Sequence, residues 1–184
     1  MNVTHTTSAS INITSKLVAH KPVDSVKAKK GSRALAQPGS SGQYETSVRL
    51  TNHTAAAIMK ILDLCKSKPE LSHLNKRKLM NLSIFHVSKL GKGQLALLES
   101  STQDFGKKTH ATPLRMSNRL HLQHAKPCLK QLREATGRSK IGLTHILTKG
   151  VLSLGNLAED EPIKLFQVLT NLQAEQFKWG LECC

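Results

Sequence analysis

Two short segments of the chain alternate apolar residues with arginine and hydroxyl side chains. The first segment, 46–52, reads TSVRLTN, and the second, 112–118, reads TPLRMSN. In each segment an arginine, Arg49 or Arg115, stands between two apolar residues. Arginine and hydroxyl groups donate hydrogen bonds to guanine edges and to phosphates. The two segments therefore have the chemistry to bind a nucleic acid.

A β-strand would give both segments two distinct faces, because successive side chains of a strand point to opposite sides. If Val48 and Leu50 point inward, the side chains that point outward are Ser47, Arg49 and Thr51. The second segment leaves two positions open for the strand, 112–117 or 116–121. With Leu114, Met116 and Leu120 inward, the outward side chains are those of Arg115, Ser117, Arg119 and His121.

An amphipathic helix is predicted after each segment, because a hydroxyl residue and an asparagine favour helix capping and apolar residues follow at helical spacing. The second copy has one extra residue before its helix. It also has Pro127 inside the helix, which must therefore start late or bend there. The expected inward residues are Ala55, Ile58, Leu62 and Cys65 in the first copy and Leu122, Ala125, Leu129 and Leu132 in the second.

A second helix follows in each copy, over about 75–90 in the first and to about Leu154 in the second. The first of these helices opens with Lys76, Arg77 and Lys78, where positive charges oppose the helix dipole. A solvated surface and a phosphate-binding site both account for this placement. In the second copy, Gly137 is suited to end one helix in a left-handed conformation, and Ser139 is suited to cap the next.

The order of strand, helix, Gly-Arg-Ser joint and helix resembles the ribbon-helix-helix family of DNA-binding proteins, over about residues 44–154. The tandem copies resemble the TraY-like members of that family. The resemblance implies an antiparallel two-stranded ribbon in the DNA major groove, with the second helices holding phosphates. It implies DNA contacts by Ser47, Arg49, Thr51, Arg115, Ser117, Arg119, Lys76, Arg77, Lys78, Arg138, Ser139 and Lys140.

The chain departs from the family pattern in its first copy, which lacks the Gly-Arg-Ser joint and has residues 69–74 in place of a tight turn. Glu45 also falls on the proposed DNA face, where phosphates would repel it. A plain basic helical bundle that echoes the pattern by chance is the alternative interpretation of the fold.

The charge of the chain indicates a polyanionic partner, most simply DNA. The formal net charge is +15. Residues 1–150 hold 25 Lys and Arg against 7 Asp and Glu, whereas residues 151–184 hold 2 against 5. An acidic protein surface is the alternative partner.

The predicted fold is mostly α-helical with a short two-stranded antiparallel ribbon, built as two fused ribbon-helix-helix-like units plus a C-terminal helix. That last helix is expected over Glu159–Phe177, with Ile163, Phe166, Leu169 and Leu172 inward. The predicted parts are a flexible basic arm at 1–43, a first unit at 44–91, a linker at 92–111, a second unit at 112–156, and the C-terminal helix with its acidic tail at 157–184.

The residues required for catalysis are not apparent, because the chain shows no Ser/His/Asp order and no paired carboxylates. We therefore expect a protein that is not an enzyme and has no cofactor and no metal. His121, His124 and Cys128 share a helical spacing that suits Zn²⁺, but a fourth ligand is missing and surface histidines are the preferred interpretation. Reduced, buried thiols are expected for Cys65 and Cys128.

Two functions are consistent with these patterns. The first is a cytoplasmic DNA-binding protein, regulatory or relaxosomal, with no membrane span. A monomer and a homo-oligomer are both open for it. The second is a bacterial type III secreted effector, in which the polar 1–43 arm serves export into a host cell and the helical body binds an acidic partner. The terminal Cys183 and Cys184 also match a lipidation site, although an unmodified tail is preferred.

Overall fold

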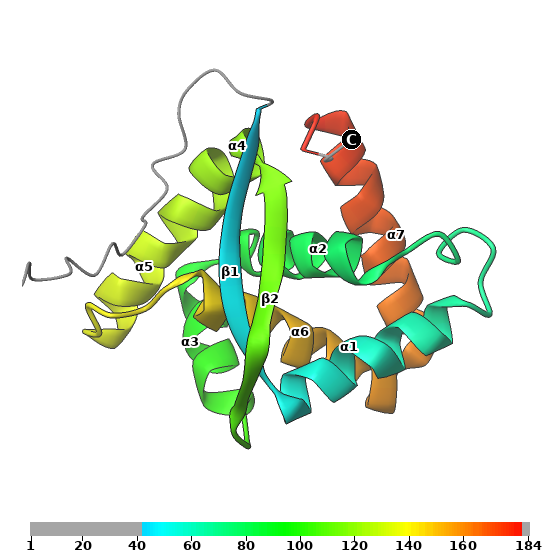
Figure 1. Cartoon of the computed structure of the whole chain (residues 1–184), viewed down its shortest axis with the longest axis horizontal. Helices are drawn as coiled ribbons and strands as arrows, with labels where there is room; N and C mark the ends of the chain where they lie inside the picture. Colours follow the sequence, from blue (N-terminus) through cyan, green and yellow to red (C-terminus); the bar gives the residue numbers. More distant parts are fainter. Residues whose placement is uncertain (1–41, 182–184) are drawn as a thin grey trace, which may run out of the picture. The chain divides into compact units, whose positions relative to one another are not determined.

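The computed structural model describes residues 42–181. This part of the chain is mostly helical and contains a two-stranded antiparallel sheet, as predicted (Figure 1). The arm predicted at 1–43 lies outside the described residues except for Gly42 and Gln43, and Gln43 already belongs to the first strand. The terminal cysteine pair also lies outside them. The elements are β1 (Gln43–Thr51), α1 (Asn52–Cys65), α2 (Lys76–Ser88), α3 (Lys92–Ser101), β2 (Lys108–Ser117), α4 (Asn118–Leu120), the π-helical turn η1 (His121–Ala125), α5 (Lys126–Thr136), α6 (Leu143–Asp160) and α7 (Pro162–Lys178).

β1 and β2 form the ribbon, and they pair antiparallel along most of their length (Figure 1). Ser47 lies opposite Pro113 and Arg49 opposite Ala111, with a register shift between Arg49 and Thr51. The predicted antiparallel pairing of the two segments is therefore confirmed. Of the two positions left open, the strand includes 112–117 and not 116–121, because the chain is helical from Asn118 onward. The strand begins earlier than predicted, at Lys108.

The inner face of the ribbon covers the core. Val48, Leu50, Leu114 and Met116 are each at most 1% exposed, as their alternation predicts. They face α2 and α6, which lie behind the ribbon in the view of Figure 1. Removal of these side chains from water provides the main force that holds the ribbon against the helices.

The helices of the two halves share one core. α1 packs mainly on α6, whereas η1 and α5 contact α2. The crossing of α2 and α6 is very close at Gly150, where a Cβ atom would lie 2.3 Å from the carbonyl oxygen of Ser83. Only glycine allows the two backbones to approach this closely.

The first helix of the second copy contains a π-helical turn. α4, η1 and α5 follow one another without a break, and η1 ends just before Pro127, which lies in the first turn of α5. The extra residue of this copy was predicted before the helix, but it lies inside it, because the first helix of each copy begins three residues after its arginine, at Asn52 and at Asn118. A π turn holds one more residue than an α turn, so η1 accommodates it. The π turn also changes which side chains face the core. Leu122, predicted inward, is 55% exposed. Ala125, Leu129 and Leu132 are buried, as predicted.

The C-terminal helices differ from the predicted boundaries. α6 continues to Asp160 instead of closing at 154–156, because the helix packs along α1 and this tertiary contact outweighs the tendency of Gly155 to end a helix. α7 therefore begins at Pro162 and not at Glu159. Ile163, predicted inward, is 75% exposed. The residues that α7 buries are Leu165, Leu169, Leu172 and Gln176.

Candidate nucleic-acid interface

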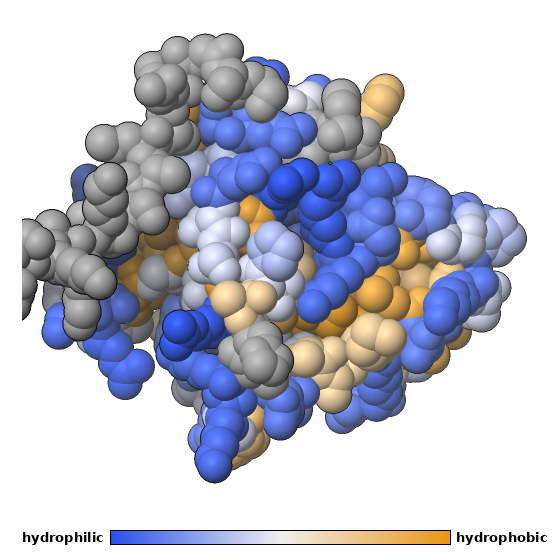
Figure 2. Space-filling model, viewed as in Figure 1, coloured by the Kyte–Doolittle hydropathy of each residue, from blue (hydrophilic) through white to orange (hydrophobic). Residues whose placement is uncertain are grey.

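The outer face of the ribbon carries three of the predicted contact residues. Ser47, Arg49 and Arg115 are all exposed and point away from the core, as the strand alternation predicts. Figure 2 shows that hydrophilic residues gather over most of the face that carries the ribbon. The ribbon therefore presents hydrogen-bond donors to solvent from both strands.

Arg115 and Arg49 differ in their surroundings. The Arg115 side chain pairs across the ribbon with Glu45, with 3.0 Å between Nε and Oε1, and both side chains are about half exposed. The backbone carbonyl of Arg115 accepts a hydrogen bond from Asn81 Nδ2 of α2 at 3.0 Å. Within residues 42–181, Arg49 makes no ion pair. Arg49 is therefore the ribbon arginine whose charge is not neutralised.

Thr51 and Ser117 do not point outward, and this part of the prediction is wrong. They are 5% and 9% exposed, because each ends its strand and caps the helix that follows. The Thr51 hydroxyl accepts from the backbone N–H of Thr54 at 3.1 Å, and the Ser117 hydroxyl accepts from that of Leu120 at 3.1 Å. The need to cap a helix turns these hydroxyls away from solvent.

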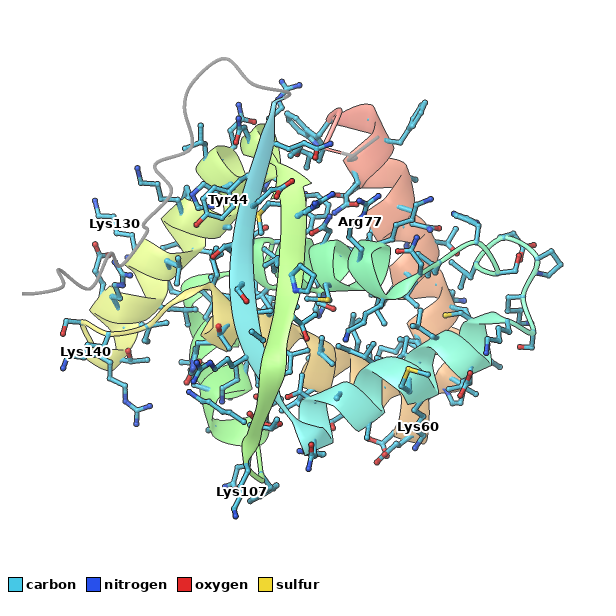
Figure 3. The ribbon with its side chains drawn as sticks, in the orientation of Figure 1. Tyr44, Lys60, Arg77, Lys107, Lys130 and Lys140 are labelled. Atoms are coloured by element: carbon cyan, nitrogen blue, oxygen red, sulfur yellow. The ribbon has the colours of Figure 1, made fainter. Side chains whose placement is uncertain are left out.

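A cluster of three basic residues, Lys76, Arg77 and Lys78, forms the first turn of α2 and flanks the ribbon on one side. The helix begins after Asn75, whose side chain accepts from the backbone N–H of Lys78 at 2.9 Å. Lys140 flanks the ribbon on the opposite side, in the segment that leads to α6 (Figure 3). Basic side chains therefore lie on both sides of the ribbon.

The 138–140 segment is an exposed basic turn between α5 and α6. Gly137 ends α5 with φ of 66°, as predicted. Ser139 does not cap α6, however, because this helix begins at Leu143 with Gly142 as its N-cap. The Arg133 guanidinium donates to the carbonyl oxygen of Ile141 at 2.7 and 3.1 Å. This contact joins the last turn of α5 to the end of the segment, and the side chains at 138–140 are exposed.

A groove runs between the ribbon and the 138–140 segment. Its rim carries Arg49, Lys108, Arg138 and Lys140, and Glu99 and Asp104 lie within it. Lys108 was assigned to the linker in the sequence analysis. β2 begins at Lys108 because it pairs with β1 as far as Thr51, which lies opposite Lys108.

Arg119 lies at the opposite end of the ribbon from Arg49. Its side chain is exposed, and Nε donates to Gln123 Oε1 at 3.3 Å. Tyr44 of β1 stacks on His121 nearby, with 3.7 Å between ring centroids and 4° between planes. His121, expected to point outward, is therefore partly covered by Tyr44, which the sequence analysis did not single out.

The proposed zinc ligands make other contacts. His121 stacks on Tyr44, His124 packs edge-on against Phe85, and Cys128 is buried. Among the side chains that the structure describes, which exclude those at 109 and 110, no group of three or more His, Cys, Asp or Glu is placed to hold a metal ion. Cys65 and Cys128 are free, buried thiols, as predicted. Burial raises the pKa of both, that of Cys128 to about 11.

The histidines beneath the ribbon predict a loss of stability in acid. Burial lowers the pKa of His86, His121 and His124 below 6.5. The positive charge of Lys126 lowers the pKa of His121 further. The charges of Lys89 and Arg119 do the same for His124. The unfolded chain therefore binds more protons near pH 6. Stability should be full above about pH 7 and should fall as the pH drops through the lowered pKa values.

Thermal melts between about pH 8 and pH 5 measure this effect. Replacement of His124 by glutamine should flatten the dependence, whereas replacement of exposed His73 by glutamine should leave it unchanged. A melting temperature that is constant or rises toward pH 5 would contradict the prediction.

Comparisons with protein-family models, with curated proteins and with solved structures give no match for this chain. No helix within residues 42–181 is long and apolar enough to cross a membrane. A functional proposal for this protein therefore depends on the ribbon and its surroundings.

Proposed function

We propose that the protein binds DNA by inserting the β1–β2 ribbon into the major groove, as two fused ribbon-helix-helix-like units. One observation carries the proposal. Ser47 and Pro113, which hold the same place in the two sequence copies, lie opposite each other in the ribbon. Pairing centred on equivalent residues is what a local two-fold arrangement of the copies requires.

The surrounding helices support the same arrangement. The second helices, α2 and α6, pack against each other, and each also packs on the first helix of the other copy. Their first turns lie on opposite sides of the ribbon (Figure 1). Helix N-termini bind phosphates through free N–H groups and the helix dipole. The cluster at 76–78 and the 138–140 segment would thus contact the backbones on either side of the groove.

The spacing of the ribbon arginines suits base-pair recognition. Arg49 lies opposite Ala111, four positions along β2 from Arg115. At about 3.4 Å per residue this separation is roughly 14 Å, or about four base-pair steps. Glu45 beside Arg115 is the least favourable element of the face, because a carboxylate repels phosphates.

The two arginines give the direct test. Arg49→Ala should weaken binding to the preferred site by about 1–3 kcal/mol, the value of a bidentate guanine contact. Arg115→Ala should cost less, because Glu45 already neutralises this side chain. Glu45→Gln should strengthen binding. Lys60→Ala, which removes a cation that lies away from the ribbon (Figure 3), is the control and should change affinity little.

The measurement is fluorescence anisotropy on a site selected from a random DNA pool, repeated at several salt concentrations. Lys76→Ala or Lys140→Ala should weaken all sequences alike and reduce the salt slope by about one, as the loss of a phosphate contact does. The proposal fails if the parent protein does not bind DNA at low salt, or if both arginine variants bind as tightly as the parent.

A further inference from the structure

A small pocket lies between the first turns of α2 and the C-terminal half of α7. Arg77, which lines it, is labelled in Figure 3. Its volume is about 80 Å³, whereas a cavity that holds one water molecule needs only about 10–15 Å³. The pocket therefore has room for several non-hydrogen atoms. Its lining combines cations, amides and two leucines: Leu74, Arg77, Lys78, Asn81, Leu82, Gln173 and Gln176.

Two buried polar atoms of this lining have no hydrogen-bond partner among the residues that the structure describes: Oδ1 of Asn81, an acceptor, and Nε2 of Gln176, a donor. Each of the two residues is only 6% exposed. The orientation of the Asn81 amide is set by its Nδ2, which donates to the carbonyl of Arg115. A buried polar group without a partner is unfavourable, because it has given up its hydrogen bonds to water. An occupant that supplies one donor and one acceptor would satisfy both atoms.

We propose that this pocket binds a small amino acid. Its ammonium group would donate to Oδ1 of Asn81, and its carboxylate would accept from Nε2 of Gln176. Arg77, on the same wall, would balance the carboxylate charge. The alkyl part of the ligand would contact the leucines of the lining. Acetate and fully ionised phosphate supply acceptors only, so neither satisfies Asn81.

Occupation of the pocket would also affect the ribbon, a consequence that rests on the proposed function. Asn81 contacts both the pocket and the backbone of Arg115. Arg77 and Lys78 line the pocket and also belong to the basic cluster proposed to contact phosphates. A bound carboxylate would compete with DNA for these cations, so the ligand should weaken DNA binding.

The test uses the full chain without DNA, so its result is independent of the proposed function. Each standard L-amino acid is added separately in a thermal-shift assay, with acetate and inorganic phosphate in parallel, and positive results are titrated by calorimetry. At least one amino acid should raise the melting temperature in a saturable way, by more than either simple anion does. The proposal is overturned if no amino acid does so, as when ordered water alone fills the pocket.

Two substitutions test whether the amino acid binds in the pocket. Gln176→Leu removes the unpaired donor and should weaken binding at least tenfold without lowering the melting temperature of the free protein. Gln173→Glu places a negative charge on the pocket wall and should also weaken binding about tenfold. Gln167→Leu, an exposed position on α7, is the control and should bind as the parent does. Unchanged affinity in both pocket variants would overturn the proposal.

Discussion

Replacement of Gly150 by alanine should destabilise the protein by about 3 kcal/mol, at the upper end of the usual cost of overpacking. The added Cβ would lie 2.3 Å from the carbonyl oxygen and 2.8 Å from the carbonyl carbon of Ser83, and 3.0 Å from Cγ2 of Val87. Two of these three atoms belong to the backbone of α2, so no side-chain rotation relieves the clash. The two helices must separate, and the core contacts around the crossing weaken.

Gly155→Ala is the matched control, because it lies five residues further along the same helix. A Cβ at Gly155 would meet only the Cβ of Ala57, at 3.4 Å, and alanine favours helix over glycine by about 0.5–1 kcal/mol. This variant should be as stable as the parent or slightly more so. Urea unfolding followed by circular dichroism measures both. Equal effects of the two substitutions would show that the α2–α6 crossing is not as close as described.

The ribbon could be predicted from the sequence because its signals are local and occur twice. Alternation around Arg49 and Arg115 identified the inner and outer faces, and the repeat indicated that the two strands pair. Alternation alone did not choose between 112–117 and 116–121. That choice depends on where the following helix begins, and the Ser117 hydroxyl, which caps this helix, decides it.

The errors occur where a tertiary contact overrides a local signal. Gly155 is a typical helix-ending residue, but α6 continues through it because the helix packs along α1. Thr51 continues the alternation of β1, but its hydroxyl is used to cap α1 and to contact Asp104. For Thr51, the sequence pattern is consistent both with an outward side chain on the strand and with a helix cap, and it does not show which role the hydroxyl has.

The surroundings of the candidate site were the hardest part to predict, because they depend on contacts between residues that are far apart in the chain. The sequence placed Glu45 on the outer face but did not show that it pairs with Arg115, since this requires the register of the two strands. The groove beside Arg49 and the pocket at Arg77 are built by segments far apart in the chain. Their linings follow only from the folded structure.

Replacement of Lys149 by methionine should also cost about 3 kcal/mol, the low end of the range for loss of one partner of a buried ion pair. Lys149 is 8% exposed. Its Nζ donates to the carbonyl oxygens of Glu99 at 2.9 Å and Thr102 at 2.6 Å, and lies 3.6 Å from Oε2 of Glu99. These carbonyls belong to the end of α3, where backbone acceptors lack helical partners. Methionine fills the space but offers no donor.

The damage should spread from α3 to the ribbon, because the segment after Thr102 leads to Asp104. The Asp104 carboxylate accepts from the hydroxyls of Thr51 and Thr54, which hold the end of β1 and the start of α1. Amide hydrogen exchange should therefore accelerate in α3 and at the start of α1. The amides that exchange only by global unfolding should also exchange faster, because the whole protein is less stable.

Lys164→Met is the control for this substitution, since it breaks an exposed pair with Glu161, 3.0 Å between Nζ and Oε1. Such pairs contribute at most about 1 kcal/mol. Urea unfolding should separate the two variants by about 2 kcal/mol or more, the difference between a buried and an exposed pair. If both variants unfold at the same urea concentration as the parent, Lys149 does not hold α3 against α6, and the position of the groove beside Arg49 must be set by other contacts.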